Sequence, residues 1–288
     1  MAPPRPPRRK RPSVAHLHSI HEQLSTRDYL QAMWDRRDFT IEVPLEELRA
    51  AHKTTLLGNM WHLVNPALTI AVYYLVFGTL LSSSRPENFL VWLTIGVFAF
   101  RTSQQTIASG AASISNNMGL IRSIRFPRAL LPISALISEL ATFAINLGVI
   151  AVVVLASGVG FSQRWLVVPL IVVIHAAINL GASFIAARLN ESFRDVQQII
   201  PFIFRLLQYA SGVMIPVERF IPSDGSGSWM ATLISWNPLL RILELYRWAF
   251  LGTDAIPAHF GQATVAGALL LWFGFRYFRA AEWRYGRA

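Results

Sequence analysis

Cysteine is absent from this chain of 288 residues, so the chain holds no disulfide bond and no thiolate metal site. Lysine is nearly absent too, because Lys10 and Lys53 are the only two. A phosphate-binding P-loop needs a lysine directly after a glycine-rich turn, and neither lysine has that context. We therefore expect no ATPase centre in this chain, no catalytic residues, and no metal or cofactor of its own.

Acidic side chains are scarce as well: 16 Asp and Glu stand against 26 Lys and Arg, which gives a net charge of +10. Such a charge can serve nucleic-acid binding, orientation in a membrane, or attraction to anionic lipid heads. Because 53% of the residues are hydrophobic, we favour the two membrane roles. Membrane lipids, and not nucleic acid, are the expected partners.

Long hydrophobic runs are what the chain does have. Six of them reach about the 18 residues that a membrane span needs. They cover residues 61–81, 88–109, 129–157, 165–187, 198–216 and 259–279. A further apolar stretch, residues 230–251, contains Arg241, Glu244 and Arg247, which are costly in lipid. We expect an all-α membrane protein with six transmembrane helices and a periplasmic re-entrant helical hairpin between spans five and six.

The distribution of Arg and Lys predicts the orientation. With six spans, most of them fall on the side that carries both termini, and short loops rich in Arg and Lys stay in the cytoplasm. Both termini are therefore expected in the cytoplasm, with the chain in the inner membrane of the cell. The expected regions are a disordered, basic, Pro-rich tail (1–24), an amphipathic interfacial segment (25–60), a transmembrane domain (61–280) and a cytoplasmic tail (281–288).

The segment before the first span is polar and has helical periodicity. Leu45, Leu48 and Leu56 fall near one face, and charged residues cover the other. This pattern predicts a helix that lies in the membrane interface. Such a helix either anchors the chain to lipid or acts as a lever that touches a cytoplasmic partner, and the sequence leaves both roles open.

Two loops on the cytoplasmic side are expected to form a docking surface. In residues 113–128, Leu120, Ile121 and Ile124 predict the buried face of a short helix with arginines around it. A basic turn explains the arginines but not the apolar face, so we expect this helix to rest in a groove of another protein. Residues 188–196 predict a second short element on the same side.

Charged residues within spans usually face the interior of a helix bundle. Arg101 and Glu139 fall at a similar depth, and Arg205 is not far from them. An Arg101–Glu139 pair would hold spans two and three together. Alternatively, Arg101 or Arg205 would bind the pyrophosphate of a lipid carrier, because arginine matches phosphate with two parallel hydrogen bonds. Both interpretations remain open at this stage.

Titratable and nucleophilic residues within the spans could indicate two other classes of function. An intramembrane hydrolase would need Ser183 and His175 in contact, yet eight residues on one helix separate them by about 12 Å. A proton-coupled secondary transporter could use the titratable Glu139 and His175, but no inverted repeat is evident. We expect no enzyme, and we keep the proton-coupled transporter as an alternative.

Four motifs in order resemble the membrane subunit of ABC-2 type exporters for polysaccharides, closest to the actinobacterial exporters of lipid-linked galactan. They are Leu57-Gly58 with Trp61 and Asn65-Pro66, Ile121-Arg122 with Phe126-Pro127-Arg128, Phe193-Arg194-Asp195, and Trp236-Asn237-Pro238-Leu239 with Tyr246-Arg247. The resemblance covers roughly residues 40–280.

The resemblance implies roles for particular segments. Residues 46–57 would be a gating helix, residues 116–126 a first coupling helix, and residues 193–196 a shorter second one. Residues 237–248 would lie in the periplasmic hairpin. The gating residues would be Glu46, Leu48, Arg49 and Lys53, and the residues that couple to the nucleotide-binding subunit Asn116, Leu120, Arg122, Arg125, Phe126, Arg194 and Asp195.

The resemblance also implies partners and a substrate. The permease would pair with a second copy of itself and with two copies of an ABC nucleotide-binding subunit that holds ATP and Mg. The cargo would be a lipid-linked polysaccharide, an undecaprenyl-diphosphate-linked galactan, moved from cytoplasm to periplasm for cell-wall synthesis. Another polymer or lipid remains the alternative cargo.

A route for sugars needs aromatic rings and small polar groups. Aromatic rings near span ends can equally form an interfacial belt. The candidates for the substrate channel are Trp61, Tyr73, Tyr74, Phe77, Trp92, Phe98, Phe100, Arg101, Arg205 and Tyr209.

Overall fold

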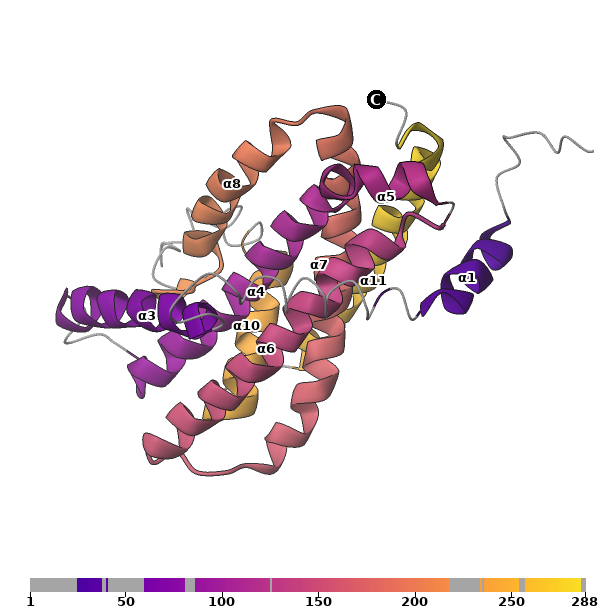
Figure 1. The fold of residues 1–288 in the computed structure, drawn as a ribbon. Coiled ribbons are helices and arrows are strands. Elements are labelled where there is room, and N and C mark those ends of the chain that lie inside the picture. The colour runs from indigo at the N-terminus through magenta and orange to yellow at the C-terminus, as the bar shows by residue number, and fades with distance from the viewer. Residues whose placement is uncertain are drawn as a thin grey trace, which may run out of the picture.

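The structure is a computed structural model that describes residues 25–37, 40, 60–80, 86–124, 126–217, 234, 236–253 and 257–285. Every regular element within these ranges is helical (Figure 1). In chain order the elements are α1 (Thr26–Asp35), α3 (Trp61–Leu80), α4 (Phe89–Asn116), α5 (Met118–Ser123), α6 (Leu130–Ala156), η3 (Gln163–Val167), α7 (Val168–Ser192), α8 (Val196–Ala210), α10 (Pro238–Leu251), α11 (Pro257–Ala280) and η5 (Glu282–Arg284).

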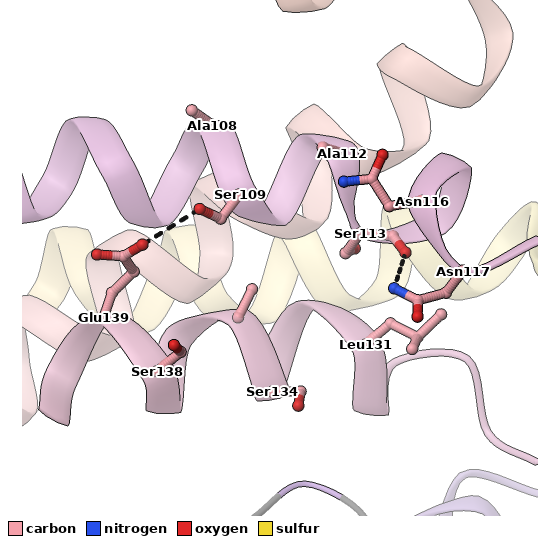
Figure 2. A pocket seen from close by; sticks show the side chains of 11 residues that line it. Ala108, Ser109, Ala112, Ser113, Asn116, Asn117, Leu131, Ser134, Ser138 and Glu139 are labelled. Carbon is pink, nitrogen blue, oxygen red and sulfur yellow. Dashed lines mark hydrogen bonds between the residues drawn. The ribbon is translucent and has the colours of Figure 1, made fainter. Parts of the chain in front are cut away.

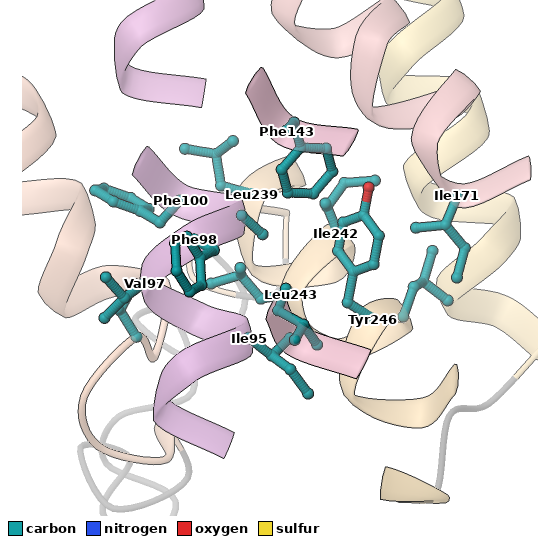
Figure 3. Close-up of a cluster of buried hydrophobic side chains, with 14 of the residues drawn as sticks. Ile95, Val97, Phe98, Phe100, Phe143, Ile171, Leu239, Ile242, Leu243 and Tyr246 are labelled. Atoms are coloured by element: carbon teal, nitrogen blue, oxygen red, sulfur yellow. The ribbon is translucent and has the colours of Figure 1, made fainter. Parts of the chain in front are cut away.

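Helix α4 is the centre of the bundle. It contacts α3, α6, α7, α8 and α10, and most of its first half is buried. Figure 3 shows the core that results: Phe98 of α4, Phe143 of α6, and Leu243 and Tyr246 of α10 converge on one cluster. The buried hydroxyls of Thr102, Thr106 and Ser113 on α4 donate to backbone carbonyl oxygens of the same helix, so these polar groups are satisfied within the bundle.

Helices α7 and α11 approach closely because two glycines face each other. A Cβ atom added to Gly274 would lie 2.2 Å from the carbonyl oxygen of Gly181. A Cβ added to Gly181 would lie 2.3 Å from the backbone of Leu270. Small residues at this contact let the two backbones touch, as they do between helices in membranes.

The sequence sets the ends of α10 clearly. The Asn237 side chain accepts a hydrogen bond from the backbone N–H of Leu239 at 3.0 Å, and Pro238 begins the helix. Gly252 ends it with φ 74°, a left-handed conformation that favours glycine. The helix has 14 residues, or about 21 Å, which is shorter than the hydrocarbon core of a bilayer. Helix α8, with 15 residues, is almost as short, so length alone does not decide which of these two helices crosses the membrane.

Each of the six predicted spans contains one long helix, although three boundaries differ. Helix α4 continues to Asn116 and α7 to Ser192, and the last residue of each helix is exposed. Helix α8 ends at Ala210, six residues early, because the chain turns at Gly212 with φ 63°. Those three boundary predictions were wrong.

Three helices of the described chain are long and apolar enough to cross a membrane. They are Leu130–Ala156, Gln163–Ser192 and Ala258–Arg284. A shorter apolar helix covers Val64–Thr79, within α3. Helix α4 is long but less apolar, and α8 has only 15 residues. The count of six spans and the re-entrant hairpin therefore stay predictions.

Candidate functional site

Helix α5 is the expected short helix between α4 and α6. Ile121 is buried, and Leu120 and Phe126 pack against the same apolar cluster as Phe278 of α11. Ile124 is 46% exposed, so the prediction that it is buried was wrong. The reason is that the backbone is already extended at Ile124, which removes its side chain from the buried face of the helix.

The second expected coupling element is a turn and not a helix. Helix α7 runs to Ser192 and α8 begins at Val196, so only Phe193, Arg194 and Asp195 connect them. All three are exposed, and the Phe193 side chain is 68% exposed. A large apolar side chain in such a position is available to another surface.

The turn and α5 belong to one end of the bundle (Figure 1). The side-chain amide of Gln197, two residues after the turn, donates to the Ser115 hydroxyl at 3.4 Å, three residues before α5. The Asn190 amide donates to the Ala111 carbonyl oxygen at 2.9 Å. We call the exposed residues at this end the α5 surface. They are Asn116, Arg122, Ile124, Phe193, Arg194 and Asp195.

A polar groove of about 490 Å³ opens between α4 and α6 (Figure 2). Its charged group is Glu139, which accepts a hydrogen bond from the Ser109 hydroxyl at 3.2 Å. Within the described chain Arg101 forms no direct ion pair with Glu139 and acts on it only as a nearby charge. The expected direct pair is therefore absent from the described contacts. The lining consists of Ala108, Ser109, Ala112, Ser113, Asn116, Asn117, Leu131, Ser134, Ala135, Ser138 and Glu139.

The candidate channel aromatics divide into two groups. Trp92, Phe98 and Phe100 are buried core side chains, so in this chain they line no open surface. The others are exposed or half-buried and lie on α3 and α8: Trp61, Tyr73, Tyr74, Phe77 and Tyr209. Aromatic residues in a membrane protein are as often core as lining, and only the packing of the helices separates the two.

Helices α3 and α8 are joined by a polar contact between candidate residues. The Gln208 amide donates to the Tyr73 hydroxyl at 3.1 Å. Arg205 is exposed on α8, with its guanidinium 5.4 Å from the centre of the Phe202 ring. Exposed rings, a cation and amide groups thus share the side formed by α3 and α8.

Arg247 is a buried cation whose partner the sequence did not indicate. Its guanidinium lies 3.4 Å from the centre of the Trp92 ring and donates to the Gly212 carbonyl oxygen at 2.9 Å. Gly96 makes room for it, since a Cβ there would lie 2.8 Å from the guanidinium. One side chain thus ties α10 to α4 and to the turn after α8.

The buried His175 also has partners that the sequence did not indicate. Its Nε2 lies 2.7 Å from the Ser103 hydroxyl, and its Nδ1 lies 3.3 Å from the Tyr246 hydroxyl. Ser183 instead donates to the Thr106 carbonyl oxygen at 3.1 Å. Each of the two residues therefore bonds separately to α4, and they do not form a nucleophile and base.

The expected gating residues Glu46, Leu48, Arg49 and Lys53 lie outside the described residues, as does Arg125. Their roles stay predictions. Within the described residues, no group of three His, Cys, Asp or Glu side chains has the arrangement of a metal site.

Three helices of the described chain are long and apolar enough to cross a membrane, and Arg247 is buried among the packed helices, which is the pattern of a membrane protein of several spans. The chain belongs to the ABC-2 type transporter family, whose profile matches residues 46–251. It is 27% identical over 221 residues to the O-antigen export system permease protein RfbA of Myxococcus xanthus, covering 77% of this chain and 83% of that protein.

Two further relatives have related names. An O-antigen export system permease protein RfbA of Klebsiella pneumoniae is 26% identical over 254 residues, covering 86% of this chain and 93% of that protein. The polysialic acid transport protein KpsM of Escherichia coli is 25% identical over 210 residues, covering 70% of this chain and 77% of the relative. The likeness therefore extends over most of both chains in each comparison.

Proposed function

We propose that this chain is the permease subunit of an ABC exporter for a polysaccharide. The observation that carries the proposal is the family match together with relatives named for O-antigen and polysialic acid transport over most of their lengths. The absence of a P-loop lysine supports a division of labour in which a separate subunit binds ATP and Mg. The chain would not hydrolyse ATP itself.

The proposed topology has six spans, α3, α4, α6, α7, α8 and α11, in the inner membrane. The arginines around α5 support a cytoplasmic location for that end and for both termini, because short loops rich in Arg and Lys stay in the cytoplasm. Helix α10 would then belong to a re-entrant hairpin on the periplasmic side, because it follows the turn after α8 and carries Arg241, Glu244 and Arg247, which are costly in lipid. In this arrangement the α5 surface faces the nucleotide-binding subunits.

The proposed route lies between two copies of this permease, on the side formed by α3 and α8. Large apolar and aromatic side chains are exposed there, and a second copy would cover part of them. Trp61, Tyr74 and Tyr209 offer rings on which sugars stack, and Arg205 would meet the pyrophosphate of the carrier lipid on this side. Arg101 would meet it only from the α4–α6 groove, since its charge acts on Glu139 there. The buried rings of α4 are not part of this route.

The proposed cargo is an undecaprenyl-diphosphate-linked galactan for cell-wall synthesis. ATP-driven closure of two nucleotide-binding subunits would push the α5 surface and open the route. The experiment is to purify the chain with its ATP-binding-cassette partner and to measure ATPase activity with and without that lipid. A two-plus-two complex stimulated by the galactan lipid supports both class and cargo. A complex indifferent to it contradicts the galactan and points to another polymer or lipid, and failure to form any complex contradicts the class.

A further inference from the structure

Three distant segments meet at the carboxylate of Glu282. The hydroxyl of Tyr29, on α1, donates to Glu282 Oε1 at 2.8 Å. The backbone N–H of Arg128, between α5 and α6, donates to the same oxygen at 2.8 Å. Glu282 itself lies in η5, after the last long helix. One oxygen atom thus joins α1, the segment that follows α5, and the C-terminal end of the bundle.

Further contacts close this junction from both sides. The Arg128 side chain donates to the backbone carbonyl oxygen of Glu282, and the backbone N–H of Ala129 donates to the Tyr29 hydroxyl at 3.3 Å. The Arg279 guanidinium lies 4.9 Å from the centre of the Tyr29 ring and donates to the Thr26 hydroxyl at 2.7 Å. Tyr29 is held through its ring and through its hydroxyl.

Burial of Tyr29 fixes the direction of the central hydrogen bond. Its side chain is 4% exposed. Burial, and then the negative charge of Glu282, raise the pKa of the Tyr29 hydroxyl, so it stays protonated and donates to the carboxylate. Burial also raises the pKa of the Glu282 carboxyl, whereas the hydrogen bonds from the Arg128 backbone N–H and the Tyr29 hydroxyl act to lower it, because they stabilise the carboxylate.

Helix α1 has two distinct faces. Tyr29 and Met33 pack into the apolar cluster that also contains Ile121 of α5 and Phe278 of α11. Leu30 and Trp34 point away from the bundle and are 51% and 68% exposed. A simple lipid anchor needs only the second face. The face with Tyr29 and Met33, together with the hydrogen bonds at Glu282, connects α1 to the segment that follows α5. That segment would move if a partner displaced α5.

We propose that Tyr29 and Glu282 are positioning residues that tie α1 to α5, so that α1 and the α5 surface move as one body during transport. The proposal rests on the proposed ABC exporter function, since a nucleotide-binding subunit must supply the push. It assigns α1 a role in passing motion from α5 toward the segment that leads into α3. Thr40, whose carbonyl oxygen accepts from the Ser134 hydroxyl of α6 at 3.4 Å, continues that connection.

The first test compares two tyrosines that each lose only a hydroxyl. Tyr29→Phe removes the bond to Glu282, whereas Tyr285→Phe removes a local bond to the Phe278 carbonyl oxygen within the same end of the chain. In proteoliposomes with the nucleotide-binding subunit, Tyr29→Phe should lower transport per ATP hydrolysed by about threefold to tenfold, the size of effect that one hydrogen bond gives. Tyr285→Phe should leave that ratio unchanged. Equal ratios in both variants would overturn the proposal.

The second test follows the motion without any need for cargo. Because the chain has no cysteine, spin labels can be placed at the exposed positions Gln31 on α1 and Ser123 on α5 through Gln31→Cys and Ser123→Cys. The distance between them should stay constant through the nucleotide cycle and become broad in the Tyr29→Phe background. A distance that changes in the otherwise unaltered protein would overturn the one-body proposal. If the signal of the single label at Ser123→Cys does not change when nucleotide is added, α5 does not move in the cycle. That result would overturn the exporter function, and the proposal with it.

Discussion

Single side chains in this bundle hold helices that lie far apart in the sequence. Arg247 is 5% exposed and connects α10, α4 and the turn after α8 through the Trp92 ring and hydrogen bonds to the Gly212 and Val213 carbonyl oxygens. A buried cation is expensive unless it is paired, and here the Trp92 ring and the Gly212 carbonyl oxygen compensate for the lost hydration. Arg247 therefore stabilises the packing of the short helix α10 against α4.

Replacing Arg247 should destabilise the packing of α10 against its neighbours. We expect Arg247→Met to lower the free energy of unfolding by about 2 to 4 kcal/mol, because a shielded cation–π contact and a charged hydrogen bond are both lost. Thermal unfolding of the purified protein in detergent measures this. The matched control is Arg276→Met, whose guanidinium lies 5.5 Å from the Trp272 ring but is exposed, so its effect should be small. Similar shifts for the two variants would refute the role of Arg247.

A substitution of Phe193 tests whether the α5 surface binds the nucleotide-binding subunit. Phe193→Ser should weaken binding of the nucleotide-binding subunit by about tenfold, as loss of an aromatic anchor does at interfaces, while the unfolding temperature changes little. Phe161→Ser is the control, because that ring is 69% exposed, close to the 68% of Phe193, but follows α6 at the other end of the bundle. Affinity measured by titration of the subunit should fall only for the first variant. Unchanged affinity in Phe193→Ser would argue against docking at this turn.

At the scale of elements, packing explains what the sequence could and could not predict. Long apolar runs located six helices, because a span must be apolar over about 20 residues. The end of α8 escaped prediction, since the turn at Gly212 interrupts an apolar run that continues in sequence. The burial of Trp92, Phe98 and Phe100 was not predicted either. The hydrophobic periodicity and the composition of a helix do not distinguish an aromatic ring in the core from one that lines a channel. Both features depend on which helices pack against each other in the fold, and the sequence pattern does not contain that information.

Contacts between distant residues were the hardest to predict. Short helix α5 was expected from three apolar residues among arginines, which is a local signal. The bond between Tyr29 and Glu282 spans 253 positions and has no local signal in either segment. The same holds for Arg247, which the sequence indicated as a charge costly in lipid and as part of a family motif, but without its partner Trp92. Local patterns gave the elements of the site, and the fold gave their partners.

The contact of α7 with α11 provides an element-scale prediction. Gly274→Ala places a methyl group against the backbone of Gly181, where neither helix can yield without moving apart. We expect poor expression and an unfolding temperature lower by several degrees, corresponding to about 1 to 3 kcal/mol of overpacking. Gly261→Ala on the same helix has no atom within 4 Å of the added methyl and should behave like the unaltered protein. If both variants are equally stable, the close approach is not needed for stability.

At the scale of the whole molecule, the chain belongs to the ABC-2 type transporter family, and we propose that a separate subunit supplies the energy. The chain has the long helices, the buried polar contacts and the family relationship of an ABC-2 type transporter, and its sequence has no lysine in a P-loop context. The α5 surface collects exposed side chains from two loops at one end, and α3 and α8 present rings and a cation along the bundle. A push at one end can therefore reach the proposed route through packed helices.

The most direct measurement of the central claim is transport of a lipid-linked polysaccharide into proteoliposomes that contain this chain and its ATP-binding-cassette partner. ATP hydrolysis is blocked by a substitution in the partner, and in a parallel sample a proton uncoupler is added. We predict that transport stops when hydrolysis is blocked and continues with the uncoupler. Transport that survives without hydrolysis and stops with the uncoupler would contradict the exporter function and establish a proton-coupled transporter.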